Sequence, residues 1–254
     1  MKAIATAPSR PAGTARAGGP PLAAPRPLGR RGSDLGYIIL GTVVPAALYL
    51  VLGYEMVLRA IGSFQAGWGR GWVSVVGGPV GQSLYAAFCL IPVGLFVVRL
   101  RPQVSDRRIL PRLVAFLGTT ILLLCGNRLP ASLQLFTIPP WAAAACTVAT
   151  TLAMAGAVWG LLTLRRSFGI FPAARRLVTT GPYRLVRHPL YLCEITAALA
   201  AVLPVGQLNP LLLFAVFCGL QLARIGYEER LLRNSFPDWA VWARRRARLI
   251  PGVW

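Results

Sequence analysis

Charged residues are scarce in this chain, and acidic residues are the scarcest of them. Only 13% of its 254 residues are Asp, Glu, Lys or Arg, whereas soluble domains average about 25%. Seven residues are acidic against 27 basic ones, while 56% of all residues are hydrophobic and the mean hydropathy is +0.60. This composition excludes an ordinary soluble domain and indicates a membrane protein.

Histidine and lysine each occur once, at His188 and Lys2, and the five cysteines lie scattered in apolar runs without a Cys-x-x-Cys pair. Zinc sites and disulfide frameworks need closer spacing or several histidines. We therefore expect no metal site, and we interpret the cysteines as small buried side chains. Arginine in place of lysine, with abundant Ala, Gly and Pro, is typical of a GC-rich genome and favours a bacterial origin.

Long apolar runs follow a segment, 1–34, that is too poor in large apolar residues to fold and that we expect to be disordered. A membrane span needs about 20 residues. The runs lie at about 35–58, 82–100, 113–127, 139–164, 189–205 and 209–227. The third and fifth runs are short, and the last two form a tight helical hairpin. The sequence thus predicts an all-α, polytopic membrane helix bundle of about five or six spans, with 35–164 as its N-terminal transmembrane region.

The basic residues also predict how the chain is oriented. If the N-terminus is cytoplasmic, the cytoplasmic segments are 1–34, 99–112, 165–188 and 224–254. They carry every Lys and Arg except Arg59, Arg70 and Arg128, which is a strong positive-inside bias. Near a membrane each basic residue gains roughly 1 kcal/mol from anionic lipids, so no nucleic-acid partner is needed to explain the charge. We predict an integral protein of the bacterial inner membrane with both termini cytoplasmic.

One polar stretch lies between the apolar runs, from Leu177 to Glu194, and it contains the single histidine. Gly181-Pro182 is a turn signal, and Pro189 suits an early position in the helix that follows. Three interpretations of His188 remain open: contact with a cofactor, capping of that helix, or a role as a base.

A second polar group lies at the end of the last apolar run. Gln221, Arg224 and Glu228 are spaced i, i+3 and i+7 and so share one face of a helix. They form either a structural ion pair with side chains reaching the interface or a ligand site. Glu55 in the first run is another intramembrane carboxylate, for which a structural role is as plausible as a functional one.

The two stretches together resemble the isoprenylcysteine carboxyl methyltransferase and phospholipid methyltransferase superfamily, integral-membrane enzymes that use S-adenosyl-L-methionine. The similarity rests on the stretch around His188 and on Arg224 with Glu228-Glu229, and covers about residues 165–254. It implies a C-terminal catalytic region with a cytoplasmic cofactor pocket, in which Arg224 faces a substrate carboxylate and Glu228 holds the cofactor's amino group. The implied cofactor-binding residues are Arg175, Arg176, Leu177, Val178, Tyr183, His188, Pro189, Leu190, Tyr191 and Glu228. Phe168, Cys193 and Glu194 depart from residue types common in the superfamily.

The resemblance implies methyl transfer to a lipid-embedded acceptor, either a prenylcysteine-type carboxylate or a lipid headgroup. The partners would be a lipid or a prenylated small molecule or protein, together with membrane lipids. A carboxylate acceptor needs no base, whereas an amine needs one, and Glu194 or Glu228 are candidates. Two alternatives remain: a sterol-reductase-like enzyme that uses a nicotinamide cofactor, and a transporter or scaffold, although we see no internal repeat.

Two further stretches have simpler interpretations. The run Gly67–Gly71 is similar to the glycine-rich loop of soluble methyltransferases, but it follows no predicted strand and is discounted. The tail from Phe236 to Trp254 mixes Trp and Arg, which favours a helix lying on the membrane surface.

Overall fold

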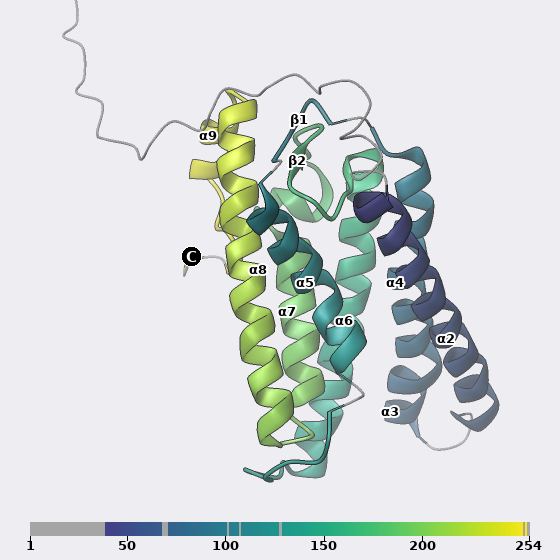
Figure 1. Ribbon diagram of the computed structural model, residues 1–254. Coiled ribbons are helices and arrows are strands. Elements are labelled where there is room, and N and C mark those ends of the chain that lie inside the picture. Colours follow the sequence, from purple (N-terminus) through teal and green to yellow (C-terminus); the bar gives the residue numbers. More distant parts are fainter. Residues whose placement is uncertain are drawn as a thin grey trace, which may run out of the picture.

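The computed structural model describes residues 39–67, 71–100, 102–106, 108–126, 129–250 and 252. The predicted disordered segment 1–34 and residues 68–70 of the glycine-rich run lie outside these residues. Long helices run side by side in the described part (Figure 1), so the predicted mostly helical fold is confirmed. The elements in chain order are η1 (Ile39–Val43), α2 (Val44–Gly67), α3 (Trp72–Val75), η2 (Val76–Val80), α4 (Gly81–Val98), β1 (Val104–Ser105), α5 (Ile109–Cys125), α6 (Pro140–Leu164), η3 (Arg165–Ser167), β2 (Ala173–Ala174), η4 (Gly181–Arg184), α7 (Pro189–Val202), α8 (Leu208–Ser235) and α9 (Trp239–Arg244).

Within the described residues, four helical stretches are long and apolar enough to cross a membrane: Gly41–Ala66, Trp72–Val98, Pro140–Ser167 and Leu208–Ser235. The short runs predicted at 113–127 and 189–205 are the shorter apolar helices α5 and α7. About five or six spans were predicted, and the described residues contain four candidate spans and two shorter apolar helices. Helix α2 continues to Gly67 and α8 to Ser235, beyond the predicted ends at 58 and 227, because backbone hydrogen bonding continues where the apolar run has stopped.

The outer surface of the long helices is apolar, as lipid contact requires. On α2 the exposed side chains include Leu50, Val51 and Leu58, and Val97 at the end of α4 is 84% exposed. Exposed apolar surface on this scale is unusual in a soluble protein. It agrees with an integral membrane protein.

The stretch Trp72–Val98 passes through a short π-helical segment, η2, that contains Pro79. Proline has no N–H to donate to the turn before it, so an α-helix must distort there. A single π turn accommodates such a distortion without ending the helix. The two halves, α3 and α4, therefore read as one candidate span.

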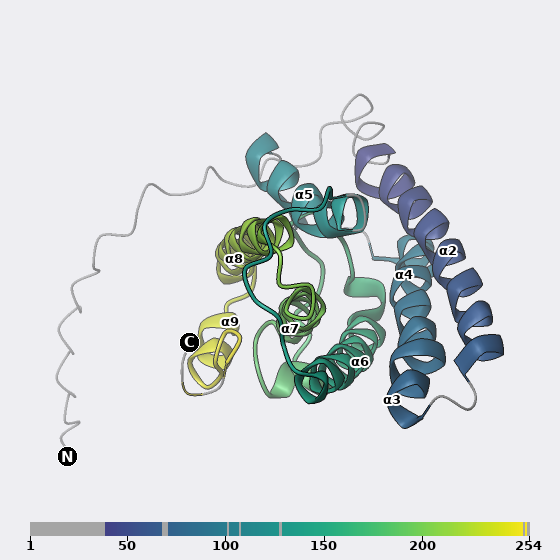
Figure 2. The same ribbon diagram turned by 90° about the horizontal axis from the view of Figure 1, so that it is seen from below.

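The helices pack in a sequence of neighbours from α2 through α4 and α6 to α7, with α5 against α8. Figure 2 shows α2 and α4 on one side of the bundle and α8 with α9 on the other. The main core cluster includes Phe88, Phe96, Met154 and Leu161. Helix α7 packs along α6, so the start of α7 lies beside the end of α6.

The connections at one end of the bundle form a small ordered layer that the all-α prediction omitted. Strand β1 pairs antiparallel with β2 in the register Val104 opposite Ala174. Val186 forms a parallel bridge with Ala247. In Figure 1 these connections and α9 gather at the same end. Two-residue strands leave too short a pattern in the sequence to be predicted.

The predicted hairpin between α7 and α8 is present, and its turn depends on Gly206. The φ angle of Gly206 is +61°, and a Cβ there would lie 2.1 Å from the carbonyl oxygen of Phe136. The backbone N–H of Leu135 donates to the Gly206 carbonyl at 2.9 Å. Only glycine fits this close approach, so the turn is tied to the loop between α5 and α6.

Candidate functional site

A pocket of about 900 Å³, counting the part that opens to solvent, lies at the end of the bundle that carries β1, β2 and α9. It is formed by the end of α6, the connector 167–188, the start of α7, the exit of α8 and Trp242. The predicted residues that line it are Arg175, Arg176, Leu177, Val178, Tyr183, His188, Leu190, Tyr191, Arg224 and Glu228. Pro189 is buried in the first turn of α7 and does not line the pocket.

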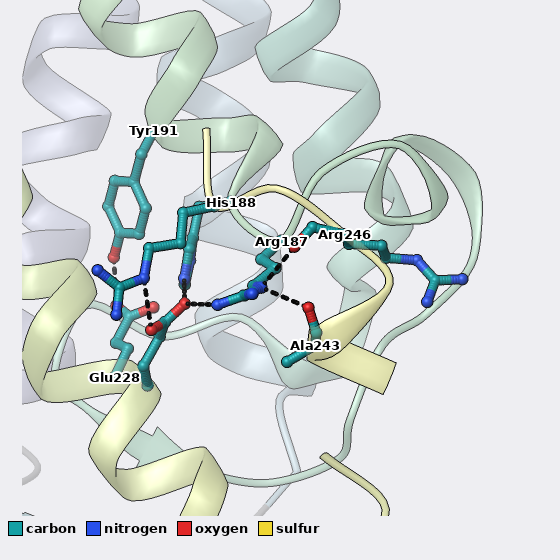
Figure 3. A network of polar contacts seen from close by, with 8 residues as sticks. Arg187, His188, Tyr191, Glu228, Ala243 and Arg246 are labelled. Carbon is teal, nitrogen blue, oxygen red and sulfur yellow. Dashed lines mark hydrogen bonds and ion pairs between the residues drawn. The ribbon is translucent and has the colours of Figure 1, made fainter. Parts of the chain in front are cut away.

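Glu228 is the carboxylate on the pocket wall. The hydroxyl of Tyr191 donates a hydrogen bond to its Oε1 (Figure 3). Tyr183 lies on the same pocket, and its burial raises the pKa of its phenol well above the usual range, with the nearby Glu228 raising it further. Tyr183 therefore stays protonated near neutral pH and remains a hydrogen-bond donor.

Arg224 is not paired with Glu228 in an i,i+4 salt bridge, the structural interpretation weighed from the sequence. Its Nη1 donates to Oε1 of Gln221 at 3.1 Å, and its Cζ lies 4.8 Å from the centroid of the Tyr191 ring. The side chain is 6% exposed and its Nε has no hydrogen-bond partner among the described residues. A buried donor of this kind costs free energy unless it is satisfied, so Arg224 is suited to receive an acceptor group from a ligand.

Gln221 in turn is held by Glu194. The Nε2 of Gln221 donates to Oε2 of Glu194 on α7. On the other side, a Cβ at Gly118 of α5 would lie 3.0 Å from Cδ of Arg224 and 3.2 Å from Oε1 of Gln221. The missing side chain at Gly118 therefore lets α5 pack directly against this polar row.

His188 contacts a carboxylate, Glu229, on α8. Its Nε2 lies 3.3 Å from Oε1 of Glu229, which also accepts from Nη1 of Arg187 at 3.1 Å. The Nε of Arg248 lies 3.0 Å from Oε2 of the same carboxylate, which is only 3% exposed. Three basic side chains thus surround one buried carboxylate. His188 is also the residue before the first turn of α7, but its side chain makes no capping hydrogen bond.

The same cluster attaches the C-terminal segment to the pocket. The Nε of Arg187 donates to the carbonyls of Ala243 and Arg246 at 3.0 and 2.8 Å, as Figure 3 shows. The backbone N–H of His188 donates to the Arg248 carbonyl at 3.0 Å. Side-chain and backbone contacts together therefore hold the segment 243–248 against Arg187 and His188, two residues of the pocket wall.

The tail, expected to be a helix on the membrane surface, contains the short helix α9, and its Trp239 packs into the protein. Trp239 is 3% exposed, with the guanidinium carbons of Arg187 and Arg233 at 5.9 and 5.2 Å from its ring centroid. Trp242 lines the pocket. Arginine planes stack well on indole, so Trp239 contributes an internal contact between the tail and the residues around the pocket.

The connector before α7 supplies the opposite wall. Arg175 is 5% exposed, and its Nε donates to the Leu100 carbonyl at 3.1 Å. A Cβ at Gly169 would lie 2.5 Å from Nη1 of Arg175, so the guanidinium lies directly against the glycine backbone. Phe168 and Leu177 line the same wall, which makes it partly cationic and partly apolar.

The sequence singled out Gln221, as part of a polar helix face, and Glu229, as part of the Glu228-Glu229 pair, but it did not predict the contacts that they make. Gln221 accepts a hydrogen bond from Arg224, Glu229 and Arg187 hold the C-terminal segment, and Trp242 lines the pocket. Cys193 packs against Gly156 of α6, where a Cβ would lie 2.7 Å from its Sγ. The other intramembrane carboxylate, Glu55, lies exposed on α2 and does not line the pocket.

The pocket thus offers a carboxylate, buried guanidinium donors, a protonated phenol and an apolar wall within one volume. A ligand with an amine, a carboxylate and an aromatic base would find a matching group for each. Among the described residues, no group of three or more His, Cys, Asp or Glu side chains lies close enough to hold a metal ion.

Comparisons with known proteins cover most of the residues that line the pocket. Residues 140–238 match the family model described as phospholipid methyltransferase. The chain is 38% identical over 76 residues to the cobalt-zinc-cadmium resistance protein CzcN of Cupriavidus metallidurans, covering 30% of this chain and 35% of that relative. It is 34% identical over 108 residues to the nickel-cobalt-cadmium resistance protein NccN of Alcaligenes xylosoxydans xylosoxydans, covering 40% and 46%. The chain thus spans less than half the length of either relative, and no solved structure matches it.

Proposed function

We propose that this integral-membrane protein, whose residues 140–238 match the phospholipid methyltransferase family model, transfers a methyl group from S-adenosyl-L-methionine to a lipid-embedded acceptor. The observation that carries the proposal is the convergence of two distant segments, 175–191 and 224–228, on one pocket. The methyl acceptor is a prenylcysteine-type carboxylate or a lipid headgroup, carried by a lipid or a prenylated small molecule or protein.

The residues of the pocket fit the parts of this cofactor. The carboxylate of Glu228 accepts hydrogen bonds from the cofactor's amino group, and Arg175 or Arg176 pairs with its carboxylate. Leu177, Val178 and Leu190 provide an apolar wall for the adenine. The cofactor supplies an activated methyl group on a sulfonium sulfur, and the protein holds that methyl in line with the acceptor.

Arg224 orients the acceptor in this proposal. Its unpaired Nε and its burial beside Tyr191 support a role in binding an anionic or carbonyl oxygen. A carboxylate acceptor is already ionised at neutral pH and needs no base. An amine acceptor must lose a proton, and Glu194 or Glu228 is the candidate base.

The orientation that follows from the arginine distribution supports the same proposal. It directs the end of the bundle that carries the pocket toward the cytoplasm of a bacterial cell, where S-adenosyl-L-methionine is made. The metal-resistance names of the two relatives supply no second candidate, because nothing in the described part of the chain gathers metal-ligating side chains.

Purified protein tests the proposal directly. We expect calorimetry to detect binding of S-adenosyl-L-methionine, and radiolabelled methyl to appear in a membrane lipid extract incubated with the protein. Spectral titration with reduced nicotinamide nucleotide provides the comparison with a reductase. Binding of the nicotinamide nucleotide without binding of S-adenosyl-L-methionine would overturn the proposal.

A substitution on α5 tests whether Arg224 acts through its position. In Gly118→Val the new side chain meets Arg224 and Gln221, and overpacking costs about 1–3 kcal/mol. We expect the initial rate of methyl transfer to fall by about tenfold, the equivalent of 1.4 kcal/mol. The control is Gly94→Val on α4, because a Cβ there meets nothing within 4 Å. Equal rates for the two variants would contradict the role of Arg224.

A further inference from the structure

A second pocket adjoins the first at the end of α6. Its wall includes Leu164, Ser167 and residues 176–178, which also line the first pocket. Three arginines line it, at positions 165, 166 and 176, and it differs from the first pocket in lacking a carboxylate such as Glu228 among its described residues. None of the described residues that line it is acidic, and Thr163, Ser167, Thr179 and Thr180 add hydroxyl groups. Guanidinium and hydroxyl donors without a competing carboxylate are suited to a phosphate.

One of these arginines, Arg165, has an uncommon backbone conformation. Arg165 has a φ angle of +47°, a left-handed conformation that residues with a side chain rarely adopt. It is kept there by its neighbours: the N–H of Leu100 donates to the Arg166 carbonyl at 2.8 Å, and Nε of Arg166 donates to the Val98 carbonyl at 2.9 Å. Strain that the surroundings maintain is a feature of binding sites.

An apolar strip on α6 leads to these arginines from the membrane-spanning part of the helix. Leu152, Trp159 and Leu162 are 67, 51 and 51% exposed. Their spacing of seven and three residues places them on one face of the helix. Leu162 and Leu100 also line the second pocket. The strip and the pocket are therefore continuous, apolar within the span and cationic at its end.

We propose that this second pocket binds the phosphate of an anionic glycerophospholipid, with an acyl chain lying along Leu152, Trp159 and Leu162. A lipid matches both parts of the surface, whereas a free phosphate matches only the arginines. A headgroup of net negative charge is preferred over phosphatidylcholine, because choline would place a cation among three guanidinium groups. The site shares Leu164, Ser167 and residues 176–178 with the cofactor pocket, whereas Arg165, Arg166 and the apolar strip lie outside that pocket.

Native mass spectrometry of the full chain in detergent tests this proposal by binding alone. Phosphatidylglycerol, phosphatidylcholine and inorganic phosphate are titrated separately. We expect phosphatidylglycerol to bind most tightly. The double variant Arg165→Gln, Arg166→Gln should lower the affinity for phosphatidylglycerol about tenfold or more, because each arginine near an anionic lipid contributes about 1 kcal/mol. Trp159→Ala should lower the affinity for phosphatidylglycerol and leave the affinity for inorganic phosphate unchanged.

The matched control is Arg244→Gln, Arg245→Gln, another adjacent and exposed arginine pair. If both double variants lose the same affinity for phosphatidylglycerol, general surface charge explains the binding and the proposed site is wrong. Inorganic phosphate that binds as tightly as the lipid, with no effect of Trp159→Ala, would overturn the lipid assignment. If the double variant does not fold, Arg165→Gln alone and the preference of the unaltered protein between the two lipids decide the question.

Discussion

Replacing Glu229 with alanine is expected to detach the C-terminal segment and to destabilise the protein by about 3 kcal/mol. The carboxylate is 3% exposed, and its oxygens lie 3.0–3.3 Å from nitrogens of Arg187, His188 and Arg248. Removing one partner of a fully buried ion pair costs about 3–5 kcal/mol. We expect the lower end because Arg248 is 35% exposed, so that water screens part of its charge.

Two measurements check this expectation. The midpoint of thermal unfolding should fall, and trypsin should cleave the folded variant faster after Arg244 and Arg245, which lie in the released segment. The control is Glu55→Ala, which removes an exposed carboxylate from α2. An unchanged midpoint together with an unchanged cleavage pattern in Glu229→Ala would show that the segment is held by its backbone contacts alone.

Glu229→Gln separates charge from shape in the same cluster. The amide keeps an oxygen that accepts from Arg187, but it places a second donor against Arg248 and removes the negative charge. We expect a loss of stability between those of Glu229→Ala and the unaltered protein. Cofactor binding should weaken in both variants, because Arg187, His188 and Trp242 line the pocket through this arrangement.

The membrane character and the two segments of the site were predictable from the sequence for physical reasons. Apolar runs need little context, because a lipid environment rewards hydrophobic length alone. The turn at Gly181-Pro182 and the start of α7 at Pro189 follow from local backbone chemistry, and the structure has both. At Gly181, where φ is +57°, an added Cβ would lie 2.8 Å from Oγ1 of Thr163, so this turn also fixes the connector against α6.

The resemblance placed Glu228 in the pocket, but the role of Glu229 was not predictable from the sequence. Neighbouring residues on a helix point about 100° apart, so one can line the pocket while the other faces away. Which one does so depends on residues 187–188 and 248, which meet α8 only after the chain has folded back. The strained Arg165 and the pairing of β1 with β2 also depend on contacts distant in sequence, and neither leaves a local pattern.

The substitution Glu228→Gln is expected to weaken binding of S-adenosyl-L-methionine by about 10- to 100-fold. A hydrogen bond to a charged group contributes about 1.5–3 kcal/mol, and each 1.4 kcal/mol is a factor of ten. In the unaltered protein the Tyr191 hydroxyl donates to Oε1 of Glu228. The amide oxygen of the variant can still accept this hydrogen bond. The shape of the pocket is thereby kept, and the change is confined to the charge that would hold the cofactor's amino group.

A ligand without that amino group separates this role from a general effect on the pocket. 5′-Methylthioadenosine carries the adenosine and the sulfur but no amino-acid moiety. We expect calorimetry to give equal affinities for 5′-methylthioadenosine in Glu228→Gln and in the unaltered protein. The control Glu55→Gln should change the affinity for neither ligand. If Glu228→Gln weakens both ligands alike, the carboxylate shapes the pocket as a whole. If it weakens neither, the amino group is bound elsewhere, and the two segments that meet in this pocket hold the cofactor in a different orientation from the one proposed.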